Sequence, residues 1–200
     1  MLKAYLQEGR IEAGCDEAGR GCLAGPVFAA AVILPPDFED ERINDSKKLT
    51  AQQRDEARQI VEENALAWAV AQFSPAEIDE HNIFRSSYLA MHRAIDALTI
   101  KPEFLLIDGK YFIEHSDIGH CCVIKGDGKY MSIAAAGILA KTHRDEYMRN
   151  LHQQFPHYQW ITNQGYPTKA HREAIRKHGP SIHHRQSFRL LPNDEQGSLF

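Results

Sequence analysis

The sequence has no hydrophobic run long enough to cross a membrane, because none approaches the ~20 consecutive apolar residues that a spanning helix needs. Residues 1–10 lack the apolar centre of a signal peptide, so we expect the protein to stay in the cytoplasm and away from membranes. Internal repeats and low-complexity segments are also missing. A chain of 200 residues that is 43% hydrophobic is instead typical of one ordinary globular domain.

Cysteine is scarce, and none of the 4 cysteines belongs to a C-x-x-C pair of the kind that binds zinc. Cys15 and Cys22 flank an acidic segment, while Cys121 and Cys122 are neighbours and poorly placed to hold one ion together. We therefore expect reduced, buried thiols, which suit a cytoplasmic protein.

Positive charge does not dominate the chain, whose formal net charge is −4. The distribution is uneven: residues 1–80 carry 8 Lys or Arg against 16 Asp or Glu, whereas residues 163–200 carry 6 against 3. A surface that binds nucleic acid presents positive charge to phosphates, so the C-terminal part is the candidate. Charge asymmetry alone does not separate such a surface from ordinary solvated charge.

The segment 11–27 is the most informative part of the chain. A predicted strand, Ile11–Cys15, leads into two adjacent carboxylates, Asp16 and Glu17, and then into the turn Gly19-Arg20-Gly21. Neighbouring side chains on a strand point to opposite faces, so both acids reach one site only if the strand ends or distorts between them. Charge at the end of a buried strand is costly unless it is paired or metal-bound, which favours a functional role over an ordinary turn.

The rest of the pattern predicts a mixed α/β domain. Predicted strands cover 27–34, 65–73, 104–107 and 121–124, and predicted helices begin at the capping boxes of Thr50 and Ser74, at Asn82, at Ser132 and at Thr168. Residues from Ser181 onward show no regular pattern. Asp108 ends one strand and Asp127 follows the next, at the strand ends where open α/β sheets hold their sites.

These acids indicate a metal site. Carboxylates held close together repel one another unless a cation lies between them. Hard oxygen ligands suit Mg²⁺ or Mn²⁺, and two such ions can activate water and stabilise the leaving oxygen in phosphoryl displacement. The residues alone therefore indicate a metal-dependent phosphodiesterase acting on nucleic acid, although Asp108 or Asp127 taken singly is typical of a turn.

Seven motifs, counted from this acidic segment onward, occur in a fixed order. They are D-E-A-G-R-G at 16–21 with L-A-G-P-V at 23–27, N-D-S-K-K-L at 44–49, I-D-G-K at 107–110, K-G-D at 125–127, A-A-A-G-I-L-A-K at 134–141, G-Y at 165–166 and T-K-A-H at 168–171. This set spans about residues 11–190 and resembles the type 2 ribonucleases H, the bacterial ribonuclease HII family in particular. The resemblance implies a ribonuclease H-like mixed sheet of about five strands flanked by helices. It implies a catalytic domain over residues 1–190 and a flexible, irregular tail over residues 191–200.

The resemblance also implies an activity and its residues. It implies an endonuclease that hydrolyses the RNA strand of RNA–DNA hybrids and incises 5′ of single ribonucleotides in duplex DNA, leaving 3′-hydroxyl and 5′-phosphate ends. The acidic quartet that would hold two Mg²⁺ or Mn²⁺ ions falls on Asp16, Glu17, Asp108 and Asp127. The sensor of the ribose 2′-hydroxyl falls on Gly19, Arg20 and Gly21, and the tyrosine that stacks on the nucleotide beyond the cleaved bond is Tyr166. Expected phosphate contacts are Lys47, Lys48, Lys169 and Arg172.

Asp145 is a fifth acidic candidate, but we expect it to be a surface or supporting charge near Arg144. Two alternatives stay open. One is a different two-metal nuclease of the same fold, such as a type 1 ribonuclease H or an exonuclease, which lacks the Gly-Arg-Gly turn. The other is a catalytically silent nucleic-acid-binding module, which gains nothing from acids facing phosphate.

The end of the chain carries a candidate docking peptide. Residues 196–200 are similar to the pentapeptide by which bacterial replication proteins bind the DNA sliding clamp. Gln196, Leu199 and Phe200 match it, whereas Gly197 stands where the pattern has leucine. The alternative, which we weigh equally, is that Leu199 and Phe200 fold back onto the domain. We expect nucleic acid as the main partner, no association with a membrane, and a monomer.

Overall fold

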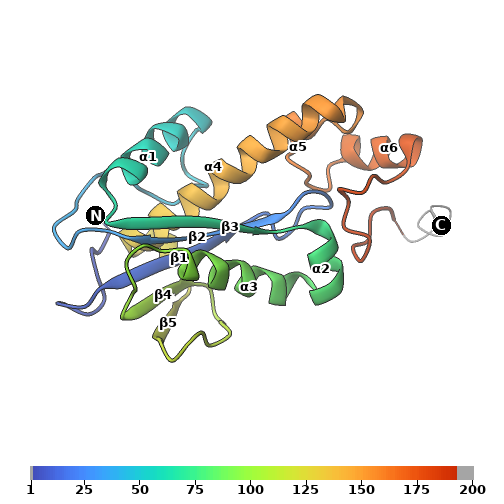
Figure 1. The fold of residues 1–200 in the computed structure, drawn as a ribbon. Coiled ribbons are helices and arrows are strands. Elements are labelled where there is room, and N and C mark those ends of the chain that lie inside the picture. Colours follow the sequence, from blue (N-terminus) through green and yellow to red (C-terminus); the bar gives the residue numbers. More distant parts are fainter. Residues whose placement is uncertain (1, 193–200) are drawn as a thin grey trace.

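One five-stranded sheet forms the centre of the protein in its computed structural model, which describes residues 2–192 (Figure 1). The strands are β1 (Glu12–Ala18), β2 (Val27–Ile33), β3 (Ala67–Phe73), β4 (Phe104–Asp108) and β5 (Gly119–Val123), in the spatial order β3-β2-β1-β4-β5. Neighbouring strands among β1, β2 and β3 pair antiparallel, whereas β4 pairs parallel with β1 and β5 pairs parallel with β4. The expected mixed sheet of about five strands is therefore confirmed.

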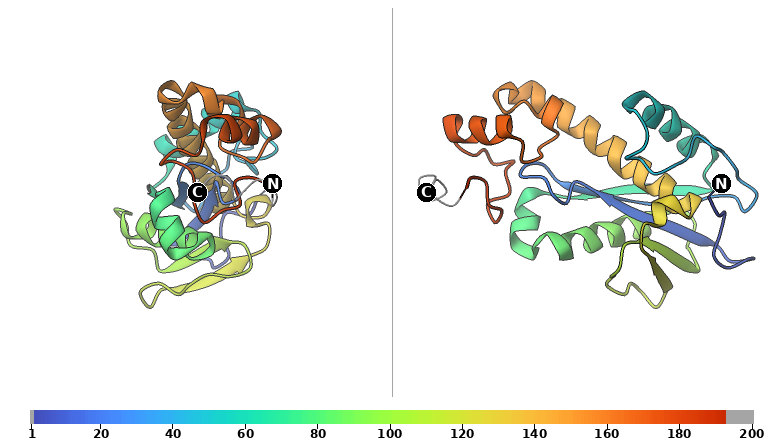
Figure 2. Two further views of the ribbon diagram at one scale, coloured as in Figure 1. Left: turned by 90° about the vertical axis from the view of Figure 1, so that its right-hand side faces the viewer. Right: turned by 180° about the vertical axis from the view of Figure 1, so that it is seen from behind.

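Helices cover both faces of this sheet, and a helical lobe lies at one end (Figures 1 and 2). One face carries α1 (Ala51–Asn64) and the long α4 (Met131–Gln154), and the other carries α3 (Ile83–Asp96) with α2 (Pro75–His81) beside it. The lobe contains α5 (Trp160–Asn163) and α6 (Lys169–His178), and the 3₁₀ turns are η1 (Gly126–Gly128) and η2 (Pro156–Tyr158). Among residues 2–192, no helix combines the length and the apolar character needed to span a lipid bilayer.

Local sequence explains where the helices begin. Thr50 and Ser74 each accept a hydrogen bond from the third residue of the following helix, whose side chain bonds back to the cap. Asn82 and Thr168 also cap helices with their side chains. Each cap satisfies backbone N–H groups that a helix leaves without partners, so the predicted starts of these helices are confirmed.

The central strand β2 is buried along its whole length, and its alternate residues serve two different cores. Ala29 and Ala31 face the core under α3, whereas Ala30 and Val32 face the core under α4. Small side chains on both faces let two layers of helices approach the sheet closely. The sheet is therefore covered on both faces beside β1, the strand that carries Asp16 and Glu17.

Two details differ from the sequence-based expectation. The first strand continues to Ala18 and so passes through both acids without ending between them. The segment between α4 and α6, for which no element was predicted, contains η2 and α5, whose Tyr158 and Trp160 are buried. These residues pack with Leu190 and Leu191, so the first residue of the expected tail is buried in the C-terminal lobe.

Candidate active site

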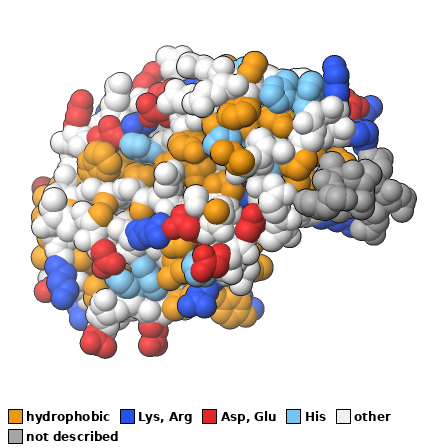
Figure 3. Space-filling view, turned by 45° about the vertical axis from the view of Figure 1, so that its right-hand side comes forward, with side chains coloured by type: hydrophobic (Ala, Val, Ile, Leu, Met, Phe, Trp, Pro, Cys, Tyr) orange, Lys and Arg blue, Asp and Glu red, His pale blue; other side chains and the backbone are white. Residues whose placement is uncertain are grey.

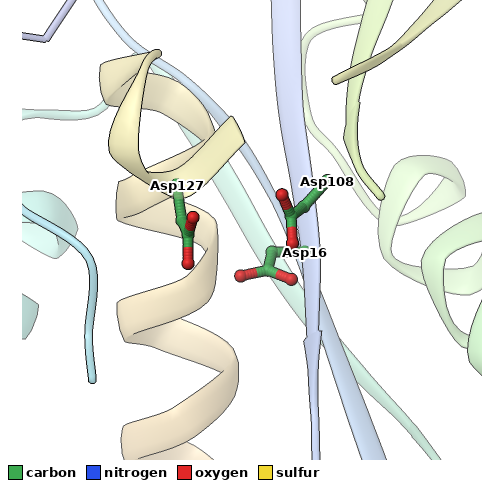
Figure 4. Close-up of side chains that lie close together, drawn as sticks. All are labelled: Asp16, Asp108 and Asp127. Atoms are coloured by element: carbon green, nitrogen blue, oxygen red, sulfur yellow. The ribbon is translucent and has the colours of Figure 1, made fainter. Parts of the chain in front are cut away.

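The parallel strands bring three acids together at their carboxyl ends. Cys15 pairs with Ile107 across β1 and β4, so the next residues along, Asp16 and Asp108, stand side by side. Beyond β5 the chain turns into η1, which places Asp127 against the same strand ends. Oxygen atoms of Asp16, Asp108 and Asp127 all lie within 4.8 Å of one another. Figure 4 shows the three carboxylates turned toward one shared space beside α4.

Glu17 reaches this region differently from the other acids. Because β1 does not end between Asp16 and Glu17, their side chains leave opposite faces of the strand, and Glu17 does not join the group of three. Its Oε1 accepts a hydrogen bond from Nη1 of Arg20 at 3.0 Å. Glu17 nevertheless lines the same cleft as Asp16 and Asp108. The expectation that the strand ends or distorts between the two acids is therefore wrong, since Glu17 reaches the cleft from a regular strand.

Burial and mutual repulsion act on these acids. Burial raises the pKa of Asp16 well above its usual value, and the charges of Glu17 and Asp108 raise it further. Burial also raises the pKa of Asp108, although the N–H of Gly126, which donates to its Oδ1 at 2.6 Å, opposes the shift. Burial raises the pKa of Glu17 against the opposing charge of Arg20. A cluster of this kind is stabilised by a cation between its members.

The donor set fits a hard divalent ion. The three converging side chains offer only carboxylate oxygens, the ligands that Mg²⁺ and Mn²⁺ prefer. Helix α4 approaches Asp16 so closely that a Cβ on Gly137 would lie 2.4 Å from Oδ2 of the aspartate. Asp16 therefore lies against the backbone of α4, which leaves no space for a residue larger than glycine at position 137. Asp16, Asp108 and Asp127 are the residues that would hold such an ion, with Glu17 beside them.

A cleft of about 280 Å³ is lined by Asp16, Glu17 and Asp108. Its walls include Gly19, Arg20, Gly21 and Tyr166, so the predicted hydroxyl sensor and the predicted stacking tyrosine share one cavity with the acids. Gly19 adopts φ +94°, a left-handed conformation that favours glycine, and a Cβ there would lie 2.1 Å from Nε of Arg144. A Cβ on Gly21 would lie 4.0 Å from the ring of Tyr166. The turn and the tyrosine are thus in direct proximity.

The four predicted phosphate contacts have different surroundings. Lys47 lines the cleft, and its Nζ lies 2.9 Å from Oδ2 of Asp127. Lys48 lines a separate hollow beside Met131. Lys169 is exposed and lies 3.8 Å from Glu173, while Arg172 donates hydrogen bonds to the carbonyl oxygens of Arg189 and Leu190.

Basic side chains nevertheless gather in the helical lobe. The last turn of α6 carries Arg176, Lys177 and His178. Lys, Arg and His side chains are visible over this end of the molecule in Figure 3. The positive charge of the C-terminal part is therefore grouped on one lobe, and the four named phosphate contacts stay predictions.

Three polar or charged residues that the sequence did not identify as site residues also line the cleft, namely Ser46, Arg54 and Lys141. Lys141 lies one helical turn after Gly137, so its spacing from the glycine was the available signal. Lys141 donates to Oδ1 of Asp145 at 2.6 Å. The expected neighbour of Asp145, Arg144, is instead buried and donates to the carbonyl oxygens of Pro26, Ala24 and Gln164. Side chains adjacent on a helix point in different directions, which explains the difference.

Comparison with known proteins agrees with this geometry. The family model for ribonuclease HII matches residues 13–191. The ribonuclease HII of Phocaeicola vulgatus is 61% identical over 98% of each chain, and that of Bacteroides thetaiotaomicron is 62% identical over 96% of each chain. A match of this extent sets aside both alternatives, the different two-metal nuclease and the silent binding module.

Solved structures show the same fold. The ribonuclease H2 of Pyrococcus horikoshii superposes with a TM-score of 0.74 at 25% identity, over 90% of this chain and 94% of that one. A ribonuclease HII from Archaeoglobus fulgidus, solved in complex with PCNA, gives a TM-score of 0.73 at 24% identity, over 92% and 97% of the two chains. With the acids on the strand ends and nearly the whole chain matched, this protein belongs to the ribonuclease HII family, nucleases that cleave RNA in RNA–DNA hybrids.

Proposed function

We propose that the protein also incises duplex DNA on the 5′ side of a single embedded ribonucleotide, by two-metal-ion hydrolysis that leaves 3′-hydroxyl and 5′-phosphate ends. One observation carries the proposal: Asp16 and Asp108 line the same cleft as the Gly-Arg-Gly turn and Tyr166, and Asp127 converges on these two acids. A nuclease that reads one ribonucleotide needs its hydroxyl sensor within one nucleotide of the reacting phosphate, and this cavity combines the two.

In this proposal the four acids bind the metal ions. Asp16, Asp108 and Asp127 would hold Mg²⁺ or Mn²⁺, and Glu17 adds a fourth carboxylate at the edge of the group. When bound, such ions supply an activated water and a counter-charge for the leaving oxygen. The protein's own contribution is to hold the carboxylates in place before metal arrives, through the Gly126 N–H on Asp108 and the contact of α4 with Asp16.

Recognition of the ribose falls to the turn at residues 19–21. The 2′-hydroxyl both donates and accepts hydrogen bonds, and it is the group that separates RNA from DNA at a given position. Glycines at 19 and 21 expose backbone groups to it, while Arg20, which also lies 4.9 Å from the ring centroid of Phe84, addresses an adjacent phosphate. Tyr166, 41% exposed, presents its ring for stacking on the next nucleotide.

Further contacts extend this proposal along the duplex. Lys47, Lys48, Lys169 and Arg172 are proposed to contact phosphates, which supply affinity without sequence preference. The cellular role that fits such an activity is the removal of misincorporated ribonucleotides by a monomeric cytoplasmic enzyme.

The C-terminal peptide is proposed to dock on the sliding clamp through Gln196, Leu199 and Phe200. These residues lie outside the part of the chain that the structure describes. Support comes from the peptide pattern and from the Archaeoglobus fulgidus relative, which was solved as a PCNA complex. Clamp binding would keep the enzyme on newly replicated DNA.

The deciding experiment compares three labelled substrates: duplex DNA with one ribonucleotide, a continuous RNA–DNA hybrid, and all-DNA duplex. Each is incubated with Mg²⁺, with Mn²⁺ and with excess chelator, and the product ends are identified. We expect metal-dependent cuts 5′ of the ribonucleotide with a 3′-hydroxyl, and an intact all-DNA duplex. Equal cutting of the all-DNA duplex would reject the role of the turn in reading the 2′-hydroxyl.

A further inference from the structure

The C-terminal segment after α6 returns to the acidic end of the sheet and lies along the residues that follow the Gly-Arg-Gly turn. We name residues 183–188 the C-terminal strap. Its His184 forms an isolated antiparallel bridge with Ala24. The N–H of Gly25 donates to the carbonyl of His183 at 2.9 Å, and the N–H of Arg185 donates to the carbonyl of Leu23 at 2.9 Å. The strap thus pairs with the chain directly after the turn.

Arg185 binds the turn itself. Its Nη2 donates to the carbonyl of Gly19 at 2.7 Å, Nη1 to that of Arg20 at 2.8 Å, and Nε to that of Gly25 at 3.0 Å. The side chain is completely buried, and no ion pair joins it to a carboxylate within residues 2–192. Burial of an unpaired charge is costly, and here the three backbone carbonyls provide the compensation. The rigid guanidinium fork therefore dictates where those carbonyls point.

The direction of the carbonyls determines the direction of the N–H groups. A peptide unit is planar and trans, so the N–H of one residue points opposite to the C=O of the residue before it. Arg185 draws the carbonyls of Gly19 and Arg20 toward the protein interior. The N–H groups of Arg20 and Gly21 consequently point away from Arg185. These are the backbone donors that the cleft needs for a ribose hydroxyl.

His184, the strap residue next to Arg185, supports the segment that carries Tyr166. Nε2 of His184 lies 3.2 Å from Nε2 of His171, whose Nδ1 lies 2.9 Å from the carbonyl of Tyr166. Nδ1 of His184 accepts from the N–H of Ser181, which leaves its Nε2–H to donate to His171. Burial lowers the pKa of His184 to about 3, so His184 is neutral at physiological pH, and burial also lowers the pKa of His171. One short segment therefore supports both the turn and the tyrosine loop.

The strap is anchored outside the cleft by one side chain on α2. Oδ2 of Asp79 accepts from the N–H of Gln186 at 2.9 Å, and Oδ1 accepts from the N–H and the hydroxyl of Ser187 at 2.9 and 2.6 Å. Asp79 is only half-buried and does not line the cleft. Its three hydrogen bonds hold the residues directly after Arg185. A substitution of Asp79 therefore removes the anchor of the strap without replacing a residue of the cleft.

We propose that the C-terminal strap sets ribonucleotide selectivity, with Arg185 as the positioning residue of the Gly-Arg-Gly turn and Asp79 as its anchor. The selectivity part rests on the proposed function, because it assumes that the turn reads the 2′-hydroxyl. The mechanical part does not, since coupling from Asp79 through Arg185 to the turn is a property of the protein without substrate.

The mechanical part is tested by amide hydrogen exchange on Asp79→Ala, with Glu80→Ala, the next residue on the same helix, as the matched control. Loss of the anchor should raise exchange at residues 19–25 by roughly tenfold, because those amides then open with the strap. The control should exchange like wild type. Unchanged exchange at residues 19–25 in Asp79→Ala would overturn the proposal, as would an equal rise throughout the chain.

The selectivity part is tested by kcat and KM on two substrates, the duplex with one ribonucleotide and the continuous hybrid. Asp79→Ala and the conservative Arg185→Lys, whose ammonium cannot span three carbonyls, should lose kcat/KM roughly tenfold more on the single ribonucleotide, where only one 2′-hydroxyl is available. Equal losses on both substrates would show a merely structural role. If wild type itself does not cut the single-ribonucleotide duplex, the proposed function fails, and the exchange result still decides the mechanical coupling.

Discussion

Nζ of Lys47 lies 2.9 Å from Oδ2 of Asp127, so an ammonium group stands beside the carboxylates that would hold metal. The loop that carries it is held by Arg54, which donates to the carbonyls of Ser46 and Leu49. Lys47 lowers the pKa values of Asp16, Glu17 and Asp108, against the burial that raises them. Without metal, this lysine partly neutralises the cluster.

The first prediction follows from that pair. Lys47→Met should lower the melting temperature in chelator and should gain more stability from Mg²⁺ than wild type, because the ion then meets uncompensated acids. The change is small, about 1 kcal/mol or less, since the lysine is 75% exposed. Lys48→Met is the matched control. Thermal unfolding across a Mg²⁺ series measures both, and a smaller Mg²⁺ gain in Lys47→Met would contradict the prediction.

The second prediction concerns the acids and pH. Asp16→Asn and Asp108→Asn should each abolish Mg²⁺-supported cleavage and reduce the stability gained from Mg²⁺ by mass action. The folded-state pKa of each acid is raised, so its contribution to stability is present below the unfolded pKa and is lost as pH rises through the folded pKa. In chelator at pH 8 the variants should be as stable as wild type or more so.

Urea unfolding at pH 4 and pH 8, with chelator and with Mg²⁺, measures these effects. The advantage of the variants in chelator should shrink toward pH 4, where wild-type carboxylates take up protons. If both variants keep the full Mg²⁺ stabilisation, the ions bind elsewhere.

The third prediction tests the close approach of α4 to Asp16. Alanine normally stabilises a helix interior by about 1 kcal/mol relative to glycine. Gly137→Ala should instead destabilise the protein and reduce cleavage, because the new methyl would lie 2.4 Å from Oδ2 of Asp16. At Gly128 a Cβ meets no atom within 4 Å, so Gly128→Ala is the stability control. A Gly137→Ala protein that is more stable and fully active would show that the helix yields easily.

The fourth prediction concerns the C-terminal peptide. Deletion of residues 196–200 should leave cleavage of short duplexes unchanged and abolish binding to the purified sliding clamp. Affinity should be micromolar or weaker, about −8 kcal/mol at best, because a short segment must be ordered on binding. Calorimetric titration of the clamp with both proteins measures it. Loss of thermal stability on deletion, or no clamp binding by the full chain, would favour the alternative that the peptide packs on the domain.

Much of the fold was predictable because its signals are local. Capping boxes at Thr50 and Ser74 indicated helix starts directly, since cap and partner lie three residues apart. The apolar run at 27–34 indicated a buried strand, because a strand covered on both faces has no polar side. The sequence pattern did not predict α5, because this helix has only four residues and depends on the lobe packed around Trp160.

The candidate site, like the fold, was predictable from the sequence only where its signals are local. The sequence by itself determined which acids follow which strands, since each adjoins its own apolar run in the chain. Only the tertiary structure decided that Asp16, Asp108 and Asp127 converge while Glu17 pairs with Arg20, because convergence depends on the parallel register of β1, β4 and β5. Likewise, no local pattern links Arg185 to Gly19, 166 positions away, because a hydrogen bond at that separation exists only once the chain has folded back on itself.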